Sequence, residues 1–154
     1  MVSNGEALWC ACNCSLHEGF RIPALYDLVD TGGAIMSTRA VFTFKDNYGE
    51  YSVYKHMDGY PSRAGESLKA TLDSKKCWDF PRFEADEFAA AFIAANKTEG
   101  GNLRLTNRAN NHDDLGYNYI ITFKDNSLFI QCYIGNKQDR LAVKGSINDL
   151  INYK

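Results

Sequence analysis

Residues 40–56, "AVFTFKDNYGEYSVYKH", carry the clearest structural pattern in the chain. Before the turn, Val41 and Thr43 alternate with two phenylalanines, and after it residues 51–54 continue the two-residue period. Such a period places successive side chains on opposite faces of a strand. The intervening "KDNYGE" contains residues that tight turns favour. The stretch therefore predicts a β-hairpin that buries one of its faces.

Further strands are expected in the C-terminal half of the chain. Residues 117–134, "YNYIITFKDNSLFIQCYI", predict a second hairpin with Asp125 and Asn126 at its turn. Short strands are expected at "NLRLT", residues 102–106, and at "LAVKG", residues 141–145.

Two helices are expected between the hairpins. The first begins near Pro61 with Ser62 as its predicted N-cap, and the second covers residues 84–97, "EADEFAAAFIAANK". The second has acidic residues in its first turn and an apolar stripe, and "SINDLINY" predicts a short C-terminal helix capped by Ser146. This order predicts an α+β fold: an antiparallel β-sheet built from two hairpins plus short strands, with two main helices packed on one face.

Composition excludes several classes of function. The chain has 154 residues, a net charge of −2 and 45% apolar residues, which suits one domain with an ordinary core. That charge provides no basic surface for duplex nucleic acid or for an anionic membrane, and no apolar run is long enough to span a bilayer. With five cysteines and no secretory signal, we expect reduced thiols in a cytosol.

The character of the sequence changes at Met36. Residues 1–35 hold four acidic residues against Arg21 alone and show no clear period, and the flexible "DTGGA" precedes the start-like "MSTR". We therefore expect residues 1–35 to be an N-terminal appendage, flexible or added by an upstream start codon. Residues 36–154 are then the single α+β domain.

Three cysteines of the appendage form a cluster, Cys10, Cys12 and Cys14, with His17 nearby. Structural zinc sites use cysteine pairs separated by two to four residues, and the spacing here is one residue with no second pair. We expect no metal and no cofactor in this protein, and keep metal binding by the cysteine cluster as an alternative.

Four segments carry a resemblance to a known family: "STRA" at 37–40, "YKHMDGYPS" at 54–62, "FPRFEADEFAAAFIAANK" at 80–97 and "HDDLGYNYII" at 112–121. Residues 36–154 resemble small uncharacterised proteins of phages, including marine cyanophages, and of some bacteria, which share a Tyr-x-His-x-Asp-Gly-Tyr-Pro block. The chain departs from the family at Met57, where a tryptophan is common. The resemblance implies a phage or phage-derived origin and brings no established activity.

The block "YKHMDGYPS" is the candidate site. Free N–H groups at the following helix start, together with Lys55, His56 and Arg63, favour an anion, and Tyr54 can stack on a base or pack at an interface. The predicted ligand-binding or partner-binding residues are Arg39, Tyr54, Lys55, His56, Asp58, Gly59, Tyr60, Arg63, His112 and Asp113.

Two other interpretations of the block compete with binding. In one, His56 and Asp58 bind a metal together with His112, Asp113 or Asp114, and a hydrolase with the set His56, Asp58 and His112 uses that metal to activate water. In the other, Asp58 and Gly59 only form a turn, Pro61 fixes the helix start, and the tyrosines cover the core. No motif for a catalytic nucleophile is present, so we assign no catalytic residue.

The sequence therefore predicts a non-enzymatic accessory protein of phage type in the host cytoplasm. Its partner would be a host protein or a small anionic ligand such as a nucleotide, with neither a membrane nor duplex nucleic acid involved. The alternatives are the metal-dependent hydrolase and a minor virion or assembly component whose first 35 residues are an interaction arm. Self-association into a homo-oligomer is also left open.

Overall fold

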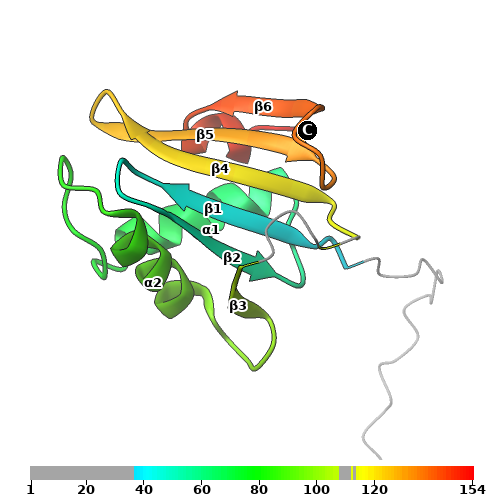
Figure 1. Ribbon diagram of the computed structural model, residues 1–154, viewed down its shortest axis with the longest axis horizontal. Coiled ribbons are helices and arrows are strands. Elements are labelled where there is room, and N and C mark those ends of the chain that lie inside the picture. Colours follow the sequence, from blue (N-terminus) through cyan, green and yellow to red (C-terminus); the bar gives the residue numbers. More distant parts are fainter. Residues whose placement is uncertain (1–36, 108–111, 113) are drawn as a thin grey trace, which may run out of the picture. The chain divides into compact units, whose positions relative to one another are not determined.

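The computed structural model describes residues 37–107, 112 and 114–154 of the chain (Figure 1). The predicted appendage of residues 1–35, its cysteine cluster and the candidate residue Asp113 lie outside the described residues. The elements follow in the order β1 (Ala40–Lys45), β2 (Glu50–Lys55), α1 (Pro61–Asp73), α2 (Ala85–Asn96), β3 (Leu103–Thr106), β4 (Tyr117–Lys124), β5 (Ser127–Ile134), β6 (Leu141–Gly145) and α3 (Ile147–Ile151).

The six strands form one sheet in the order β3-β2-β1-β4-β5-β6. Both predicted hairpins are present as β1–β2 and β4–β5, and the α+β prediction is confirmed. At the turn between β4 and β5, Asp125 and Asn126 have φ values of 50° and 63°. Positive φ at both central residues is the geometry of a two-residue hairpin turn that matches the strand twist.

The prediction of an antiparallel sheet built from hairpins is wrong, because the sheet is mixed. The two hairpins meet through β1 and β4, which run parallel with Ala40 opposite Tyr117. Strand β3 lies at one edge of the sheet, and β4, the next strand in sequence, begins beside the start of β1. There the Gly116 N–H donates to the Arg39 carbonyl at 2.9 Å. A strand that begins beside the start of β1 runs parallel to it. Residue alternation fixes which side chains are buried, but not which strands become neighbours.

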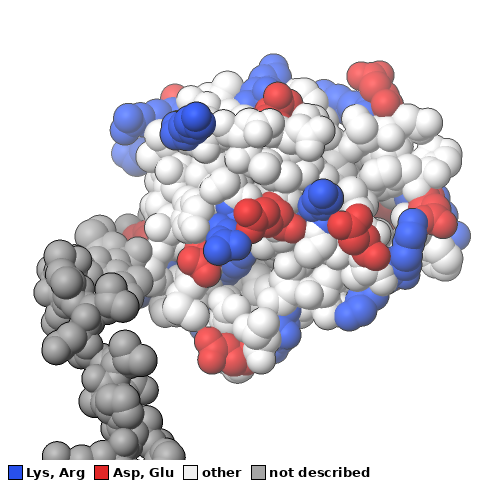
Figure 2. All heavy atoms as spheres, turned by 180° about the vertical axis from the view of Figure 1, so that it is seen from behind, with Lys and Arg blue, Asp and Glu red and all other residues white. Residues whose placement is uncertain are grey.

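The three helices cover one face of the sheet, and the opposite face is called the open face below (Figure 1). Phe42 of β1 is fully buried on the helix face, with its ring 4.7 Å from that of Tyr119 on β4 and 4.8 Å from that of Phe92 on α2. Behind the sheet, basic and acidic side chains are interspersed over the helices (Figure 2). The helix face therefore holds the core, and its outer surface is of mixed charge.

Helix α1 begins earlier than the sequence predicts. Its N-cap is Tyr60, and Pro61 occupies the first turn, so the prediction of Ser62 as the N-cap is wrong. Proline is well suited to this position because the first N–H groups of a helix have no partner within the helix. The block "YKHMDGYPS" therefore contains the end of β2, a turn and the start of α1.

Asp46 connects the β1–β2 turn to helix α2. One carboxylate oxygen accepts the N–H groups of Tyr48 at 2.7 Å and Gly49 at 2.8 Å, and the other accepts the N–H of Ala85 at 2.9 Å. Ala85 is the first residue of α2, whose own N-cap residue makes no capping bond through its side chain. Asp46 therefore caps α2 from another element. The Ala85 N–H is the main reason that the pKa of Asp46 lies below its ordinary value.

We expect Asp46→Ala to lower the free energy of unfolding by about 1–2 kcal/mol, as the loss of a helix cap does. Because the folded-state pKa is lowered, the stabilisation is present above pH ~4 and is lost as the pH falls through the folded-state pKa. Urea unfolding of the wild type and the variant between neutral and acid pH measures this difference.

Asp125→Ala is the matched control, because Asp125 lies in the other hairpin turn and caps no helix. An unfolding difference for Asp46→Ala that stayed constant down to acid pH would contradict the assigned role of the carboxylate.

Candidate functional site

Strand β2 divides the predicted site between the two faces of the sheet. Tyr54 pairs with Val41 and lies on the open face, whereas Lys55 pairs with Ala40 and lies on the helix face. His56 follows two residues after Tyr54, and its Nδ1 atom lies 3.2 Å from the Tyr54 hydroxyl. Neighbouring residues of the predicted motif therefore line different cavities.

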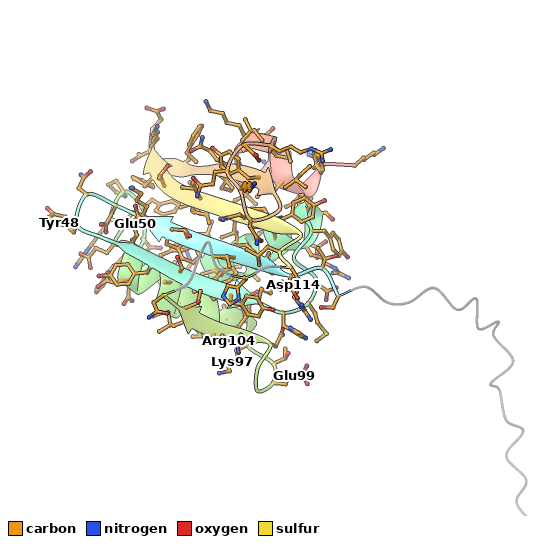
Figure 3. All side chains as sticks on the ribbon, turned by 45° about the vertical axis from the view of Figure 1, so that its right-hand side comes forward. Tyr48, Glu50, Lys97, Glu99, Arg104 and Asp114 are labelled. Atoms are coloured by element: carbon orange, nitrogen blue, oxygen red, sulfur yellow. The ribbon has the colours of Figure 1, made fainter. Side chains whose placement is uncertain are left out.

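On the open side, a cavity of about 570 Å³ joins four of the predicted residues, Arg39, Tyr54, His56 and His112. This Tyr54 cavity is also lined by Arg104, Asp114 and the loop before β3. Figure 3 shows Arg104 and Asp114 at the same end of the sheet, with Glu99 on the neighbouring loop. The segments around residues 56 and 112, far apart in sequence, therefore meet in one site.

Tyr54 is the centre of this cavity. Its ring stacks with that of His112 at a centroid distance of 4.5 Å, and the Arg104 guanidinium carbon lies 4.7 Å from the same ring centroid. The His112 Nε2 atom lies 3.1 Å from the Thr106 hydroxyl, which holds the imidazole against β3. The Tyr54 side chain is buried, together with Val41 and Leu115, in a small cluster on the open face.

The Tyr54 cavity is lined by two arginines, Arg39 and Arg104, and by two carboxylates, Glu99 and Asp114, so its formal charges balance, but not every polar group is paired. Arg39 forms an ion pair with Asp114, while its Nε atom is buried and has no hydrogen-bond partner. Arg104 forms no ion pair with any of the residues that the structure describes. The Asn102 side-chain oxygen is also buried without a partner at the cavity wall. The site thus offers one guanidinium and two buried polar atoms to a ligand.

On the helix side, a second cavity of about 480 Å³ contains Lys55, Asp58 and Arg63. In this Lys55 cavity the lysine is only 7% exposed, and its Nζ donates to the Ser67 hydroxyl at 2.8 Å. Burial lowers the pKa of Lys55. Arg63 pairs with Glu66 at 2.6 Å and donates to the Tyr60 hydroxyl at 3.3 Å. The cationic donors near the start of α1 are therefore already engaged within the protein.

The turn residues Asp58 and Gly59 have separate roles. Asp58 has a φ of 54°, so the left-handed conformation of this turn falls on the aspartate. Gly59 is required for space, because a Cβ atom there would lie 2.6 Å from the Ala40 Cβ and 2.8 Å from the Thr38 carbonyl oxygen. The Gly59 N–H donates to that same carbonyl, and the Gly59 carbonyl accepts the Tyr119 hydroxyl at 2.7 Å.

The three residues of the hydrolase alternative do not line one cavity. His56 and His112 line the Tyr54 cavity, whereas Asp58 lines the Lys55 cavity. Among the residues with described positions, no group of three or more His, Cys, Asp or Glu side chains is arranged to hold a metal ion.

Two residues of the Tyr54 cavity, Arg104 and Asp114, are absent from the binding residues predicted from the sequence, where Asp114 is considered only as a metal ligand. Arg104 faces the open side only because β3 pairs with β2 in a register that sets Arg104 opposite Tyr54. Its alternation with two leucines in "NLRLT" marks it as a residue facing away from the core, but does not reveal its neighbour. Asp114 lies next to the proposed Asp113 and pairs with Arg39.

Comparisons of the chain with protein-family models, with curated proteins and with solved structures found no match. In the described part of the chain, no helix has the length and apolar character needed to cross a membrane. The chemistry of the site is therefore interpreted from its own geometry.

We expect Gly59→Ala to lower the free energy of unfolding by more than about 2 kcal/mol, since the added methyl group overlaps the β1 backbone. Asp58→Gly should change it by less than about 1 kcal/mol, because glycine adopts the left-handed conformation without strain. Chemical unfolding of both variants measures the contrast, and equal effects would contradict the steric requirement assigned to Gly59.

Substitution of the buried Lys55 should raise the free energy of unfolding, whereas Asp46→Ala and Gly59→Ala should lower it. Lys55→Met should stabilise the protein at pH 7 by about 1 kcal/mol, because a buried ammonium is costly to desolvate. The unfolded chain binds more protons at Lys55, so wild-type stability should rise with pH and the advantage of the variant should shrink toward pH ~10.

Thermal or urea unfolding at several pH values tests this prediction, with Lys69→Met, an exposed lysine on the neighbouring helix α1, as the control. A loss of more than about 1 kcal/mol at pH 7 in Lys55→Met would mean that the bond to Ser67 outweighs the cost of burial.

Proposed function

We propose that this protein is a small binding protein of phage type that takes an anionic ligand with a planar ring, such as a nucleotide, in the Tyr54 cavity. The proposed phage origin and action in the host cytoplasm rest on the four sequence segments that resemble the phage family. The proposed ligand class rests on the cavity itself.

The observation that carries the proposal is the Arg104 guanidinium beside the stacked rings of Tyr54 and His112. Arginine binds phosphate with two parallel hydrogen bonds, and aromatic or imidazole rings stack on a base. Arg104 and the His112 ring, supported by the buried ring of Tyr54, supply both functions within one cavity of about 570 Å³, a volume typical of sites for small molecules.

The buried polar atoms of the wall also favour a polar ligand. Arg39 Nε is a buried donor without a partner, and the Asn102 side-chain oxygen is a buried acceptor without one. A buried polar group without a hydrogen bond costs about 1–3 kcal/mol, so a ligand that pairs with either atom recovers part of this cost. A ligand with both donors and acceptors, such as a nucleobase, suits this wall.

The expected affinity is modest. Stacking on an aromatic ring contributes about 1–3 kcal/mol, and a charge-assisted hydrogen bond contributes about 1.5–3 kcal/mol. Together they give about 2.5–6 kcal/mol, which corresponds to dissociation constants from about 10 mM to about 50 µM. A free nucleotide at cellular concentration, or a nucleotide held by a larger partner, fits this range better than a scarce signalling molecule.

Isothermal titration calorimetry with the four nucleoside monophosphates, the matching nucleosides and inorganic phosphate tests the proposal. We expect a monophosphate to bind at least about tenfold more tightly than its nucleoside, since the phosphate pairs with Arg104. Arg104→Ala should remove this preference, and Arg104→Lys should restore only part of it because lysine lacks the planar fork.

Arg82→Ala is the matched control, because Arg82 stacks on Trp78 at 4.0 Å and lines neither cavity. The proposal is wrong if none of these compounds binds at millimolar concentration, or if Arg104→Ala binds as the wild type does.

A further inference from the structure

The open face of strands β4, β5 and β6 has a surface that the Tyr54 cavity does not include. The ring of Phe129, on β5, has two ammonium groups beside it: Lys124 Nζ at 4.9 Å and Lys144 Nζ at 5.7 Å from the ring centroid. Gln131 and Tyr133 follow on the same face of β5, and the Gln131 amide donates to the Tyr133 hydroxyl at 3.2 Å. These five residues are called the Phe129 platform.

From this platform the strand register continues across the sheet in a row of one residue per strand, in which Ile120 is apolar and Thr43 is buried. Ser52, Thr43, Ile120, Gln131 and Lys144 lie opposite one another in turn on β2, β1, β4, β5 and β6. With strands about 4.8 Å apart, the row is about 20 Å long. The helices lie on the other side of the sheet, so no described helix covers it (Figure 1).

The charge of the platform differs from that of the whole chain. Strands β4, β5 and β6 contain no aspartate or glutamate, although the chain has a net charge of −2. On the helix side, by contrast, acidic and basic side chains alternate (Figure 2). Lys124 and Lys144 form no ion pair with any described residue, and their contact is with an aromatic ring. The platform is therefore basic and aromatic, and complementary to a polyanion with exposed rings.

We infer that the Phe129 platform binds single-stranded nucleic acid. Phe129 stacks on a base, Lys124 and Lys144 move from the ring to the flanking phosphates, and the Gln131 amide hydrogen-bonds a base edge. Aromatic side chains between basic ones on a sheet surface suit unpaired bases, since every base presents a ring face for stacking.

The geometry favours a single strand over a duplex. The major groove of DNA, about 12 Å wide, admits a helix or a two-stranded ribbon, and the platform lies within a six-stranded sheet that is too broad to enter it. In a duplex the bases are also stacked on one another and present only their edges. The platform has a half-buried ring with two lysine ammonium groups over it, and these can move to phosphates when a base stacks on the ring, so it matches a single strand.

This inference is independent of the proposed nucleotide site. Tyr54 lies on β2 and Phe129 on β5, three strands apart in the sheet, which corresponds to about 14 Å. The two sites share no lining residue. Variants of one site therefore leave the other unchanged.

Fluorescence anisotropy with labelled single-stranded DNA and RNA of about ten nucleotides, and with the matching DNA duplex, tests the inference. We expect a single strand to bind at least about tenfold more tightly than the duplex at low salt. With two phosphates neutralised, log K should fall with log salt with a slope of about −1.4. Either Lys124→Ala or Lys144→Ala should weaken binding and reduce the slope by about 0.7.

Phe129→Ala should weaken binding at least about fivefold, and Phe129→Tyr should keep it because the ring face remains. The tyrosine variant separates loss of stacking from loss of folding. Lys69→Ala, an exposed lysine on α1, is the control for general charge effects and should bind as the wild type does.

Arg104→Ala and excess nucleoside monophosphate should leave strand binding unchanged, so failure of the nucleotide proposal and failure of this inference are distinguishable. Equal affinity for duplex and single strand, no binding to either, or wild-type binding by Phe129→Ala and Lys144→Ala would each overturn the inference.

Discussion

The structure depends on the burial of Phe42 between the two halves of the sheet and helix α2. The ring of Phe42 contacts Tyr119 and Phe92, so one side chain joins β1, β4 and α2. Burial of three aromatic rings is worth several kcal/mol, and this contact holds the parallel β1–β4 pair on which the sheet order rests. Tyr119 also reaches the turn of the candidate site, because its hydroxyl donates to the Gly59 carbonyl. Burial raises the pKa of that hydroxyl, so it remains a donor.

The same core divides the motif "YKHMDGYPS" between two environments. The side chain of Lys55 is buried beside α1, while Tyr54 and His56 lie toward the open face. The functional and structural interpretations of the motif therefore apply to different residues. Asp58, Gly59 and Lys55 serve the turn and the packing of α1, whereas Tyr54 and His56 line a cavity with residues from β3 and from the chain before β4.

The hydrophobic core lies on one face of the sheet, and both proposed sites lie on the opposite face. Three helices cover one face of the sheet and enclose the aromatic core. The outer surface on this side carries both acidic and basic side chains. The open face has polar, aromatic and basic residues, of which Tyr54, Thr43 and Asn118 are buried, and it holds both of the sites proposed above. Both proposed sites use a cation beside an aromatic ring, Arg104 on Tyr54 and two lysines on Phe129. In the first pair the Tyr54 ring is buried beneath Arg104, and in the second the Phe129 ring is half-buried beneath the lysines.

The sequence by itself determined the two hairpins, the turn at Asp125 and Asn126, the main helices and the position of the candidate block, because residues close in the chain encode period and turn conformation. It also indicated Arg39, Tyr54, His56 and His112, which line one cavity. Only the tertiary structure decided the parallel β1–β4 pair, the cap that Asp46 provides to α2, the burial of Lys55 and the place of Arg104. Each of these follows from contacts between segments distant in sequence, such as Asp46 with Ala85, and a local pattern contains no information about which distant segments meet.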